Sequence, residues 1–600
     1  MKNQRDLSFW KLWNLSFGFF GVQIAYALQS SQVSRIFSTI GADPHDLSYF
    51  WILPPLMGMI VQPIVGSASD KTWNRLGRRL PYLVAGALVA IFVMCLLPNA
   101  GSFGLGISQA IIFGLVMLML LDTSINMAMQ PFKMLVGDMV NEKQKGFAYS
   151  IQSFLCNAGS VVGYIAPLCL ALFLSNTAPE GEVPPTVTWA FYIGAVILLL
   201  CVVYTFATVR EMPPAEYAEF HGVDTSAAAE AGKKSNLIAI LAKAPKVFWT
   251  VGLVQFFCWA GFMYMWVYST ETIANQAYDT PTVERVEGVT VNGKKYNDKY
   301  LFDGKMPVIQ DGRLALAGIK VDGSFSSPSL VVLGGDTIIS DGAVVYKNGV
   351  AAVAPHGGEI AVSAPLFVDG MEISAGKLET VSRYSLIGPD SKLTLAHIAR
   401  PQSGTGEYLL EETSDLPSVA SVGEVTLNYH KVLNVASAEY QEAGNQTGLL
   451  FAIQGIVAVL WAIVLSRFGQ RRKLAYSLSL LIGGAGFAMV FAGDSLLVLG
   501  IGYGLAGCAW AAMLAMPFTI LTNALSGNNI GTYLGLFNCT ICLPQIIASL
   551  LGGLILGLIP TTAKGVPNAP AMILISGILL AIGAIAVWNI KETYGSRDAN

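Results

Sequence analysis

The sequence contains few charged residues for its length. Only 12% of its 600 residues are Asp, Glu, Lys or Arg, and 53% are hydrophobic. Because an ordinary soluble domain carries about twice that fraction of charge, the composition excludes a soluble globular protein and favours a membrane protein. The formal net charge is -3, which provides no excess of basic residues for a polyanion. We therefore expect no nucleic-acid partner.

Metal-binding patterns are lacking as well. The eight cysteines all lie in apolar runs. Cys539 and Cys542 have no second pair and no nearby histidine, so they do not form a metal motif. We interpret the cysteines as small buried side chains and expect no metal and no cofactor. A cleavable signal peptide is not expected either, because the N-terminus leads directly into an apolar run of full length.

Twelve long apolar runs are present, and they predict twelve membrane-spanning helices. Each is close to or above the ~20 residues that a helix needs to cross the hydrocarbon core. The runs cover residues 13–34, 47–69, 81–98, 108–136, 147–174, 187–209, 248–273, 446–465, 474–492, 495–523, 531–558 and 570–589.

Basic residues mark the alternate connections between these runs. They cluster after the second, fourth, sixth and eighth runs, whereas the other short connections carry almost none. By the positive-inside rule, the basic connections, both termini and the central loop 210–246 are cytoplasmic. The sequence therefore predicts a multi-pass plasma-membrane protein.

A repeated basic turn divides the runs into two groups of six. Residues 75–79 read RLGRR and residues 467–472 read RFGQRR, and each turn follows the second run of its group. Two unrelated basic clusters would explain the charges but not the shared Arg-x-Gly spacing. We predict one six-helix half at 1–209, a linker at 210–246, and a second half formed by 247–275 and 441–600. This is the architecture of the major facilitator superfamily, which binds its substrate between the halves.

Residues 276–440, between the seventh and eighth runs, do not share this pattern. They are polar and rich in turn residues, and VVYKNGVAAV at 344–353 has the alternation and the Asn-Gly pair of a β-hairpin. We predict an all-β extracytoplasmic insert, which has to fold without disulfides because it contains no cysteine. Its histidines, at positions 356, 397 and 430, are too scattered for a catalytic pair, so we predict that the protein is not an enzyme.

Asp122 lies near the middle of the run 108–136, and no other run has an ionisable side chain of this kind in its central part. A charge at that depth costs roughly 2.5–3.5 kcal/mol on insertion scales, so we expect Asp122 to face the protein interior or a wet cavity. Removal from water disfavours the charged form of a carboxyl, which makes Asp122 the candidate for proton exchange. The alternative is a structural Asp that pairs with Asn126 or with a hydroxyl at the end of a run.

Four stretches resemble the sucrose transporter family, which comprises the plant sucrose–proton symporters and their animal and bacterial relatives. Motifs of that family are matched in order by GVQIAYALQ at 21–29, GMIVQPIVGSASDKTWNRLGRRLP at 58–81, LDTSINMAMQPFKMLVGD at 121–138 and LGLFNCTICLPQ at 534–545. Lys133 stands where the family has Arg, and the insert has no counterpart in the plant pattern. The resemblance covers both predicted halves.

The resemblance implies secondary active transport, namely proton-coupled symport of a disaccharide or α-glucoside, sucrose- or maltose-like, into the cytoplasm by alternating access. It also implies that Asp122 takes the coupling proton and bonds sugar hydroxyls. Sodium coupling is an alternative, although the run 47–69 lacks the acidic residues that melibiose-type carriers use there. A further alternative is a non-transporting sugar sensor or docking protein that uses the insert to bind a partner.

Sugar recognition requires side chains that donate and accept hydrogen bonds, together with aromatic faces. In the first run Gln23 and Tyr26 share one helix face, whereas Gln29 lies off that stripe. Gln255 and Trp259 belong to an aromatic stripe of the seventh run, which packing between helices would also explain. The predicted sugar-binding residues are Gln23, Tyr26, Asp122, Asn126, Asn157, Gln255, Trp259 and Asn538.

Charged residues at the cytoplasmic ends predict a gate. Asp70 ends the second run and Arg78 and Arg79 lie on the following turn, so the opposite charges can pair and then separate when the halves rock. Asp138 with a nearby lysine is an additional candidate pair, and solvated charges that only set the orientation are the alternative. The predicted gate residues are Asp70, Arg78, Arg79, Arg471 and Arg472.

Partners and location follow from the same features. We expect a sugar substrate and the lipid bilayer as partners, and a monomer. An extracytoplasmic domain without cysteines and short loops fit a bacterial inner membrane, with the insert in the periplasm. There the insert is a candidate for docking an extracytoplasmic protein.

Overall fold

The computed structural model describes residues 6–104, 107–179, 181–213, 244–291, 425–468, 471–524 and 537–590, together with short strands between 294 and 401. The chain divides into two compact units. One consists of Met1–Pro281 with Leu433–Asn600, and the other consists of Thr282–Val432. The first unit contains the helices and the second contains the strands.

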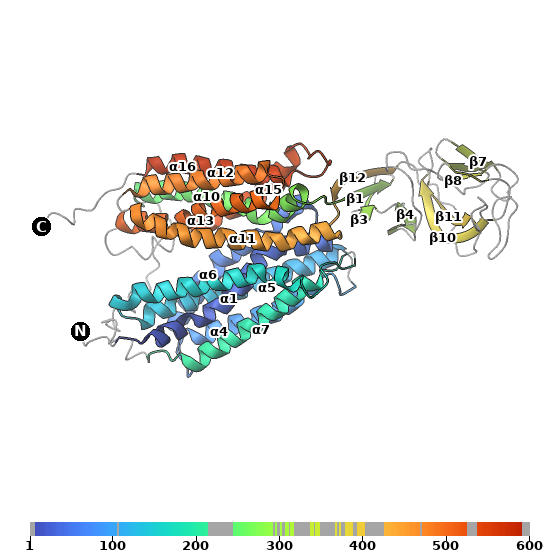
Figure 1. The fold of residues 1–600 in the computed structure, drawn as a ribbon. Helices are drawn as coiled ribbons and strands as arrows, with labels where there is room; N and C mark the ends of the chain where they lie inside the picture. The colour runs from blue at the N-terminus through green and yellow to red at the C-terminus, as the bar shows by residue number, and fades with distance from the viewer. Residues whose placement is uncertain are drawn as a thin grey trace. The chain divides into compact units, whose positions relative to one another are not determined.

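The first unit begins with six long helices (Figure 1). They are α1 (Phe9–Ile40), α3 (Leu53–Lys71), α4 (Leu80–Leu96), α5 (Ile107–Met139), α6 (Glu142–Leu170) and α7 (Pro185–Thr208). A short helix, α2 (Pro44–Phe50), precedes α3, and a 3-10 turn, η1 (Leu97–Asn99), extends α4.

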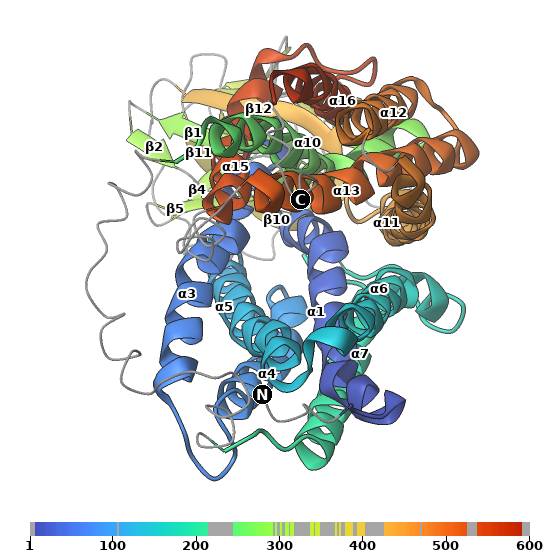
Figure 2. The same ribbon diagram turned by 90° about the vertical axis from the view of Figure 1, so that its left-hand side faces the viewer.

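A second set of long helices completes this unit. It comprises α10 (Lys246–Gln276), α11 (Ala438–Leu465), α12 (Arg472–Ala492), α13 (Leu496–Ala524), α15 (Cys539–Leu558) and α16 (Ala569–Ala586), with 3-10 turns η3 (Ser466–Phe468) and η4 (Val587–Asn589). Figure 2 shows α1 and α3–α7 as one group and the helices from α10 onward as another. We refer to these two groups as the first and second halves.

Among the described residues, eleven helices are long and apolar enough to cross a membrane, and they match eleven of the twelve predicted runs. The exception is the first run, 13–34, which lies in α1. This helix has 32 residues, but its buried side chains include Gln23, Gln29, Gln32 and Arg35. These polar groups lower the mean hydropathy of α1. They are tolerated because α1 contacts other helices over much of its length.

A glycine in a left-handed conformation ends α1. Gly41 has φ +110°, which residues with a Cβ rarely adopt. Its N–H donates to the carbonyl oxygen of Ser38 (3.0 Å), and the N–H of Ala42 donates to that of Phe37 (2.8 Å). This is the Schellman pattern, and it turns the chain sharply into α2, whose N-cap side chain, Asp43, accepts a hydrogen bond from the His45 N–H.

The second unit contains short antiparallel strands. One sheet has β12 (Val425–Leu433), β1 (Thr282–Val291) and β2 (Lys294–Tyr296) in that order, and β3 (Tyr300–Phe302) also pairs with β1. The remaining described strands form separate two-stranded sheets. These are β4 (Pro307–Gln310) with β5 (Arg313–Leu316), β6 (Thr337–Ser340) with β7 (Ala343–Lys347), β8 (Leu366–Val368) with β9 (Met371–Ile373), and β10 (Leu378–Ile387) with β11 (Leu393–Pro401).

The strand pairs differ from the predicted all-β insert, because the described strands are not joined into one sheet. The first strand of the hairpin predicted at 344–353 is part of β7, which pairs with the preceding strand β6. Residues 348–353, which would form the turn and the second strand of that hairpin, lie outside the described part of the chain. The dipeptide between β6 and β7 is Asp-Gly, and Asn-Gly separates β1 from β2, as two-residue hairpin turns favour.

Candidate functional site

Asp122 is buried inside the first half, with 2% of its surface exposed. Its Oδ1 accepts a hydrogen bond of 2.6 Å from Nε2 of Gln29 on α1. Its Oδ2 and the Oε1 of Gln29 are also buried, and neither has a hydrogen-bond partner among the described residues. Because buried polar atoms are rarely left unpaired, these two oxygens mark a place where a proton, water or ligand completes the site.

Tyr26 lies beside this carboxyl. Its electrostatic neighbours include Asp122 on α5, Tyr164 on α6 and Cys542 on α15. Three helices of the first half and one of the second therefore meet around Tyr26. Asn538 is one turn before Cys542 and donates to its Sγ over 3.9 Å, so the structure brings this predicted residue close to the same group.

Asn126 connects two helices of the first half. Its Nδ2 donates to the backbone carbonyl oxygen of Asp122 (2.8 Å), and its Oδ1 accepts from Nε2 of Gln62 on α3 (2.7 Å). The carboxyl of Asp122 is therefore bonded to Gln29 rather than to Asn126, unlike the structural pairing considered above. The sequence analysis missed Gln62, although it belongs to the family motif at 58–81.

Other polar residues predicted on the first half bond groups other than the carboxyl. Gln23 is buried, and its Oε1 accepts from Ser160 of α6 (3.4 Å). The glutamine that reaches Asp122 is Gln29, which was placed off the binding stripe. Asn157 donates to the carbonyl oxygen of Ser153 within its own helix (2.8 Å).

The aromatic stripe of α10 surrounds a tryptophan of α13. The ring centroids of Trp259 and Trp266 each lie 5.7 Å from that of Trp510. Gln255, one turn before Trp259, donates to the Met513 carbonyl oxygen (3.4 Å). The Oε1 of Gln255 and the Nε1 of Trp259 are buried without a partner among the described residues. The stripe therefore combines interhelical packing with two unpaired polar atoms.

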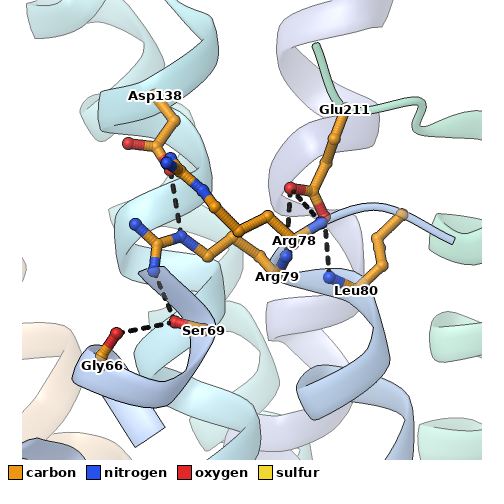
Figure 3. A network of polar contacts seen from close by, with 7 residues as sticks. All are labelled: Gly66, Ser69, Arg78, Arg79, Leu80, Asp138 and Glu211. Carbon is orange, nitrogen blue, oxygen red and sulfur yellow. Dashed lines mark hydrogen bonds and ion pairs between the residues drawn. The ribbon is translucent and has the colours of Figure 1, made fainter. Parts of the chain in front are cut away.

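Figure 3 shows the polar network at the end of the first half that carries Arg79. Arg78 donates to Oδ2 of Asp138 (2.6 Å), and Nε of Arg79 donates to the same oxygen (3.0 Å). Arg79 also bonds the hydroxyl of Ser69. The carboxylate of Glu211 accepts the backbone N–H groups of Arg78, Arg79 and Leu80 at 2.7–3.0 Å.

This network differs from the predicted gate. Both arginines bind Asp138, whereas the side chain of Asp70 lies outside the described residues. Arg471 and Arg472 form no ion pair with another described residue. Glu211 was not predicted, because it follows the sixth run in what appeared from sequence to be only a linker.

Arg35 lies at the opposite end of the bundle and is completely buried. Its Nε donates to Gln441 (2.7 Å) and its guanidinium nitrogens donate to Asn445 (2.8 Å), Asn176 (2.9 Å) and Gln32 (3.1 Å). Gln441 and Asn445 belong to α11 of the second half. Sequence reasoning did not select Arg35, although four polar residues in succession (QSSQ, 29–32) precede it closely within an otherwise apolar run.

Glu271, near the end of α10, is a second buried carboxyl and was also missed. It is 6% exposed, and its Oε1 accepts hydrogen bonds from Tyr440 of α11 (2.6 Å) and Ser38 of α1 (3.4 Å). We call this end of the bundle, defined by residues 32–48 of the first half with 266–271 and 440–448 of the second, the Arg35 end.

The two halves are in close contact at the Arg35 end. The hydrogen bonds that join described residues of the two halves all involve residues 32–48 or Asn176 of the first half. A Cβ on Gly448 would collide with the carbonyl oxygen of Tyr164, and one on Gly444 would collide with the Arg35 side chain. The Arg35 end is therefore closed in this structure.

Two family models match the chain. Residues 33–275 match the model described as MFS/sugar transport protein, and residues 421–599 match that described as Major Facilitator Superfamily. Together they cover both halves.

Curated relatives include plant and animal transport proteins. Sucrose transport protein SUC4 of Arabidopsis thaliana is 26% identical over 274 residues, 43% of this chain and 53% of that protein. Sucrose transport protein SUT4 of Oryza sativa subsp. indica is 30% identical over 213 residues, 32% and 36% of the two chains. Solute carrier family 45 member 4 of Homo sapiens is 28% identical over 153 residues, 24% and 20% of the two chains. The matches thus span at most about half the length of these relatives.

Solved structures share the fold. A D-xylose-proton symporter has a TM-score of 0.53 at 11% identity and covers 97% of both chains. A bacterial homologue of the human lysosomal transporter Spinster has a TM-score of 0.51 at 11% identity, with 97% of this chain and 96% of that chain covered.

Proposed function

The chain belongs to the major facilitator superfamily and resembles its sucrose transporters, and from this we propose that it is a proton-coupled symporter that moves a disaccharide or α-glucoside into the cytoplasm. The observation that carries the proposal is the buried carboxyl of Asp122, which is bonded on one oxygen to Gln29 and unpaired on the other. The relatives of the chain are named as transport proteins, not as enzymes.

Asp122 suits a proton as the coupling ion. The partner of its Oδ1 is a neutral amide, and no ion pair among the described residues includes it. A buried carboxylate without a cation is costly, so the group gains a proton when it is shut away from water. Sodium would require several oxygen ligands, whereas the carboxyl of Asp122 contacts an amide N–H.

The unpaired polar atoms suit a sugar. Asp122 Oδ2 and Gln29 Oε1 in the first half are acceptors without a described partner. In the second half Gln255 Oε1 is such an acceptor and Trp259 Nε1 is such a donor. Sugar hydroxyls can both donate and accept, and the tryptophans add apolar faces. A ligand bound to both halves favours their approach, which is the step that alternating access requires.

The closed Arg35 end represents one stage of that cycle. From the distribution of basic residues, we propose that the Arg35 end faces the extracytoplasmic side. The opposite end, where Arg78 and Arg79 bind Asp138, then faces the cytoplasm. The strands of the second unit then lie on the extracytoplasmic side, where we propose that they belong to a β-rich domain. To open the Arg35 end, the hydrogen bonds between α1 and α11 have to break.

Uptake of radiolabelled sucrose and maltose into proteoliposomes tests the proposal. We expect accumulation with an inward proton gradient, loss of accumulation when a protonophore removes the gradient, and inhibition by unlabelled substrate. Accumulation on a sodium gradient alone would contradict proton coupling. Sugar binding without uptake under either gradient would contradict transport and favour the sensor. Empty liposomes are the control for leakage.

A further inference from the structure

Glu271 is a buried acid that the transport mechanism above does not use. We propose that Glu271 is a second proton-binding residue, which must take up a proton before the Arg35 end can close. The proposal rests on the alternating-access part of the proposed function. It assigns to Glu271 control of one gate, whereas Asp122 remains the site of the transported proton.

The position of Glu271 couples it to closure. Its Oε1 accepts from Ser38 of the first half and from Tyr440 of the second half. Separation of the halves at this end would remove Ser38 and expose the carboxyl to water. Closure buries the carboxyl again, together with Tyr440, which is completely buried, and Ser38, which is 2% exposed.

The nearby cation does not neutralise Glu271. Arg35 directs four of its five N–H donors to the amide oxygens of Gln441, Asn445, Gln32 and Asn176. Among ion pairs of the described residues, none joins Arg35 to Glu271. The two hydrogen bonds to Glu271 come from neutral hydroxyls. A carboxylate with these partners is costly to bury, and a protonated carboxyl is not.

The other charged groups near Glu271 do not neutralise its carboxylate. Its electrostatic neighbour is Asp43, a second acid that holds the ring of His45 at 2.8 Å. Arg35 acts instead on Tyr440 and Glu442. The packed helix α16 has no titratable residue, and α13 contributes the phenol of Tyr503. The titratable groups placed against Glu271 are thus Tyr440 of α11 and Asp43 before α2. Arg35 is next to Tyr440, Glu442 is next to Arg35, and His45 is next to Asp43.

The proton has a defined path in this cycle. In the open state Glu271 exchanges with the water at the Arg35 end. On closure it binds one proton from that water on Oε2, while Oε1 keeps the bonds from Tyr440 and Ser38. On reopening it returns the proton to the same side. Glu271 therefore adds no transported proton, and a lower pH favours the closed state.

Distance measurements between spin labels on the two halves test this inference without a transport assay. Phe173→Cys after α6 and Leu497→Cys at the start of α13 provide exposed positions near this end. The exposed Cys169 and Cys539 are replaced by serine to restrict labelling. In lipid nanodiscs, the ratio of open to closed molecules should rise with pH, by up to roughly tenfold per unit for one linked proton.

The test uses an Asp122→Asn background, because Asp122 also exchanges a proton when it is shut away from water. Asp122→Asn, which keeps the Glu271 carboxyl, should retain the pH dependence, as should Asp122→Asn with Tyr440→Phe. Glu271→Gln in the Asp122→Asn background should abolish the dependence and remain closed at every pH, because the amide resembles the protonated acid. A dependence that persists in this double variant, or a double variant that is open at every pH, would overturn the inference. If Glu271→Gln does not fold, Glu271→Asp serves instead, and it should keep the dependence with a shifted midpoint. Absence of sugar uptake would contradict the proposed function but not this result.

Discussion

The carboxyl of Asp122 combines burial with a single neutral donor, Gln29. We expect Asp122→Asn to abolish accumulation of sugar against its gradient, because the amide cannot exchange the coupling proton. Downhill exchange of sugar should persist, since Asn retains hydrogen-bonding capacity. Thr123→Val is a matched control, because the Thr123 hydroxyl bonds only the Met119 carbonyl oxygen of its own helix. Undiminished accumulation by Asp122→Asn would contradict a coupling role.

Depth in an apolar run was sufficient to select Asp122, but not to select its partner. Gln23 and Gln29 are both on α1, and only the packing of α1 against α5 determines that Gln29 reaches the carboxyl. Arg35 and Glu271 were missed for another reason. Charges near the end of a run are ordinarily interpreted as interfacial, and their burial depends on contact between two halves that are far apart in sequence.

At the scale of single helices, the start of α4 shows how a carboxylate can stabilise an end. Glu211 accepts hydrogen bonds from three backbone N–H groups there. Its negative charge also interacts favourably with the positive end of the helix dipole. Glu211→Gln should lower the unfolding free energy by about 0.3–2 kcal/mol, measured as a lower thermal midpoint. Glu439→Gln, an exposed acid in the first turn of α11, should change it less. Equal shifts for both variants would contradict the role of Glu211.

The approach of α11 to α6 depends on the absence of a side chain at Gly448. A Cβ there would collide with the carbonyl oxygen of Tyr164. Gly448→Ala should therefore destabilise the closed Arg35 end, by about 1–3 kcal/mol as is usual for overpacking, and the distance between labels on the two halves should increase. Gly455→Ala on the same helix is the control, because a Cβ at Gly455 meets nothing within 4 Å. If the two variants have the same distance distribution, close packing at Gly448 does not determine closure.

Helix positions were predictable because long apolar runs have few alternatives in a membrane. The first run shows the limit of this approach. Its helix, α1, forms although it is not apolar enough to be one of the eleven candidate membrane spans among the described residues. Its polar residues are tolerated because they face other helices, and this orientation cannot be obtained from the run alone. In the second unit, an Asn-Gly pair separates β1 from β2 and an Asp-Gly pair separates β6 from β7, as expected of two-residue hairpin turns.

For the whole molecule, the two matching basic turns do not have matching surroundings. In the first half, Arg78 and Arg79 share Asp138. In the second half, Arg471 and Arg472 have no ion pair with a described residue. The repeat in sequence therefore predicted the repeated helices better than it predicted the charged network. Both networks at the ends of the first half also include residues outside its helices, namely Glu211 after α7 and Asn176 between α6 and α7.

The ends of the strand-containing unit are held together within the helical unit. The N–H of Asn434 donates to the carbonyl oxygen of Pro281 (2.7 Å), and Leu433 is buried. Replacement of residues 284–430 by a short Gly/Ser linker can therefore retain both anchors. We expect the shortened protein to keep the thermal midpoint of the helical unit and measurable sugar uptake, because Asp122, Gln29 and the Arg35 end lie outside the deleted segment.

A shortened protein that inserts and keeps its thermal midpoint but does not transport would make the strand-containing unit part of the transport cycle. Spin-label distances at Phe173 and Leu497 then distinguish two causes. A changed distribution would indicate that the unit affects closure of the Arg35 end, since its anchors, Pro281 and Asn434, lie in the chain that connects α10 to α11. An unchanged distribution would indicate a role in substrate capture before closure. Retained transport with an unchanged distribution would leave docking of an extracytoplasmic protein as the role to test for this unit.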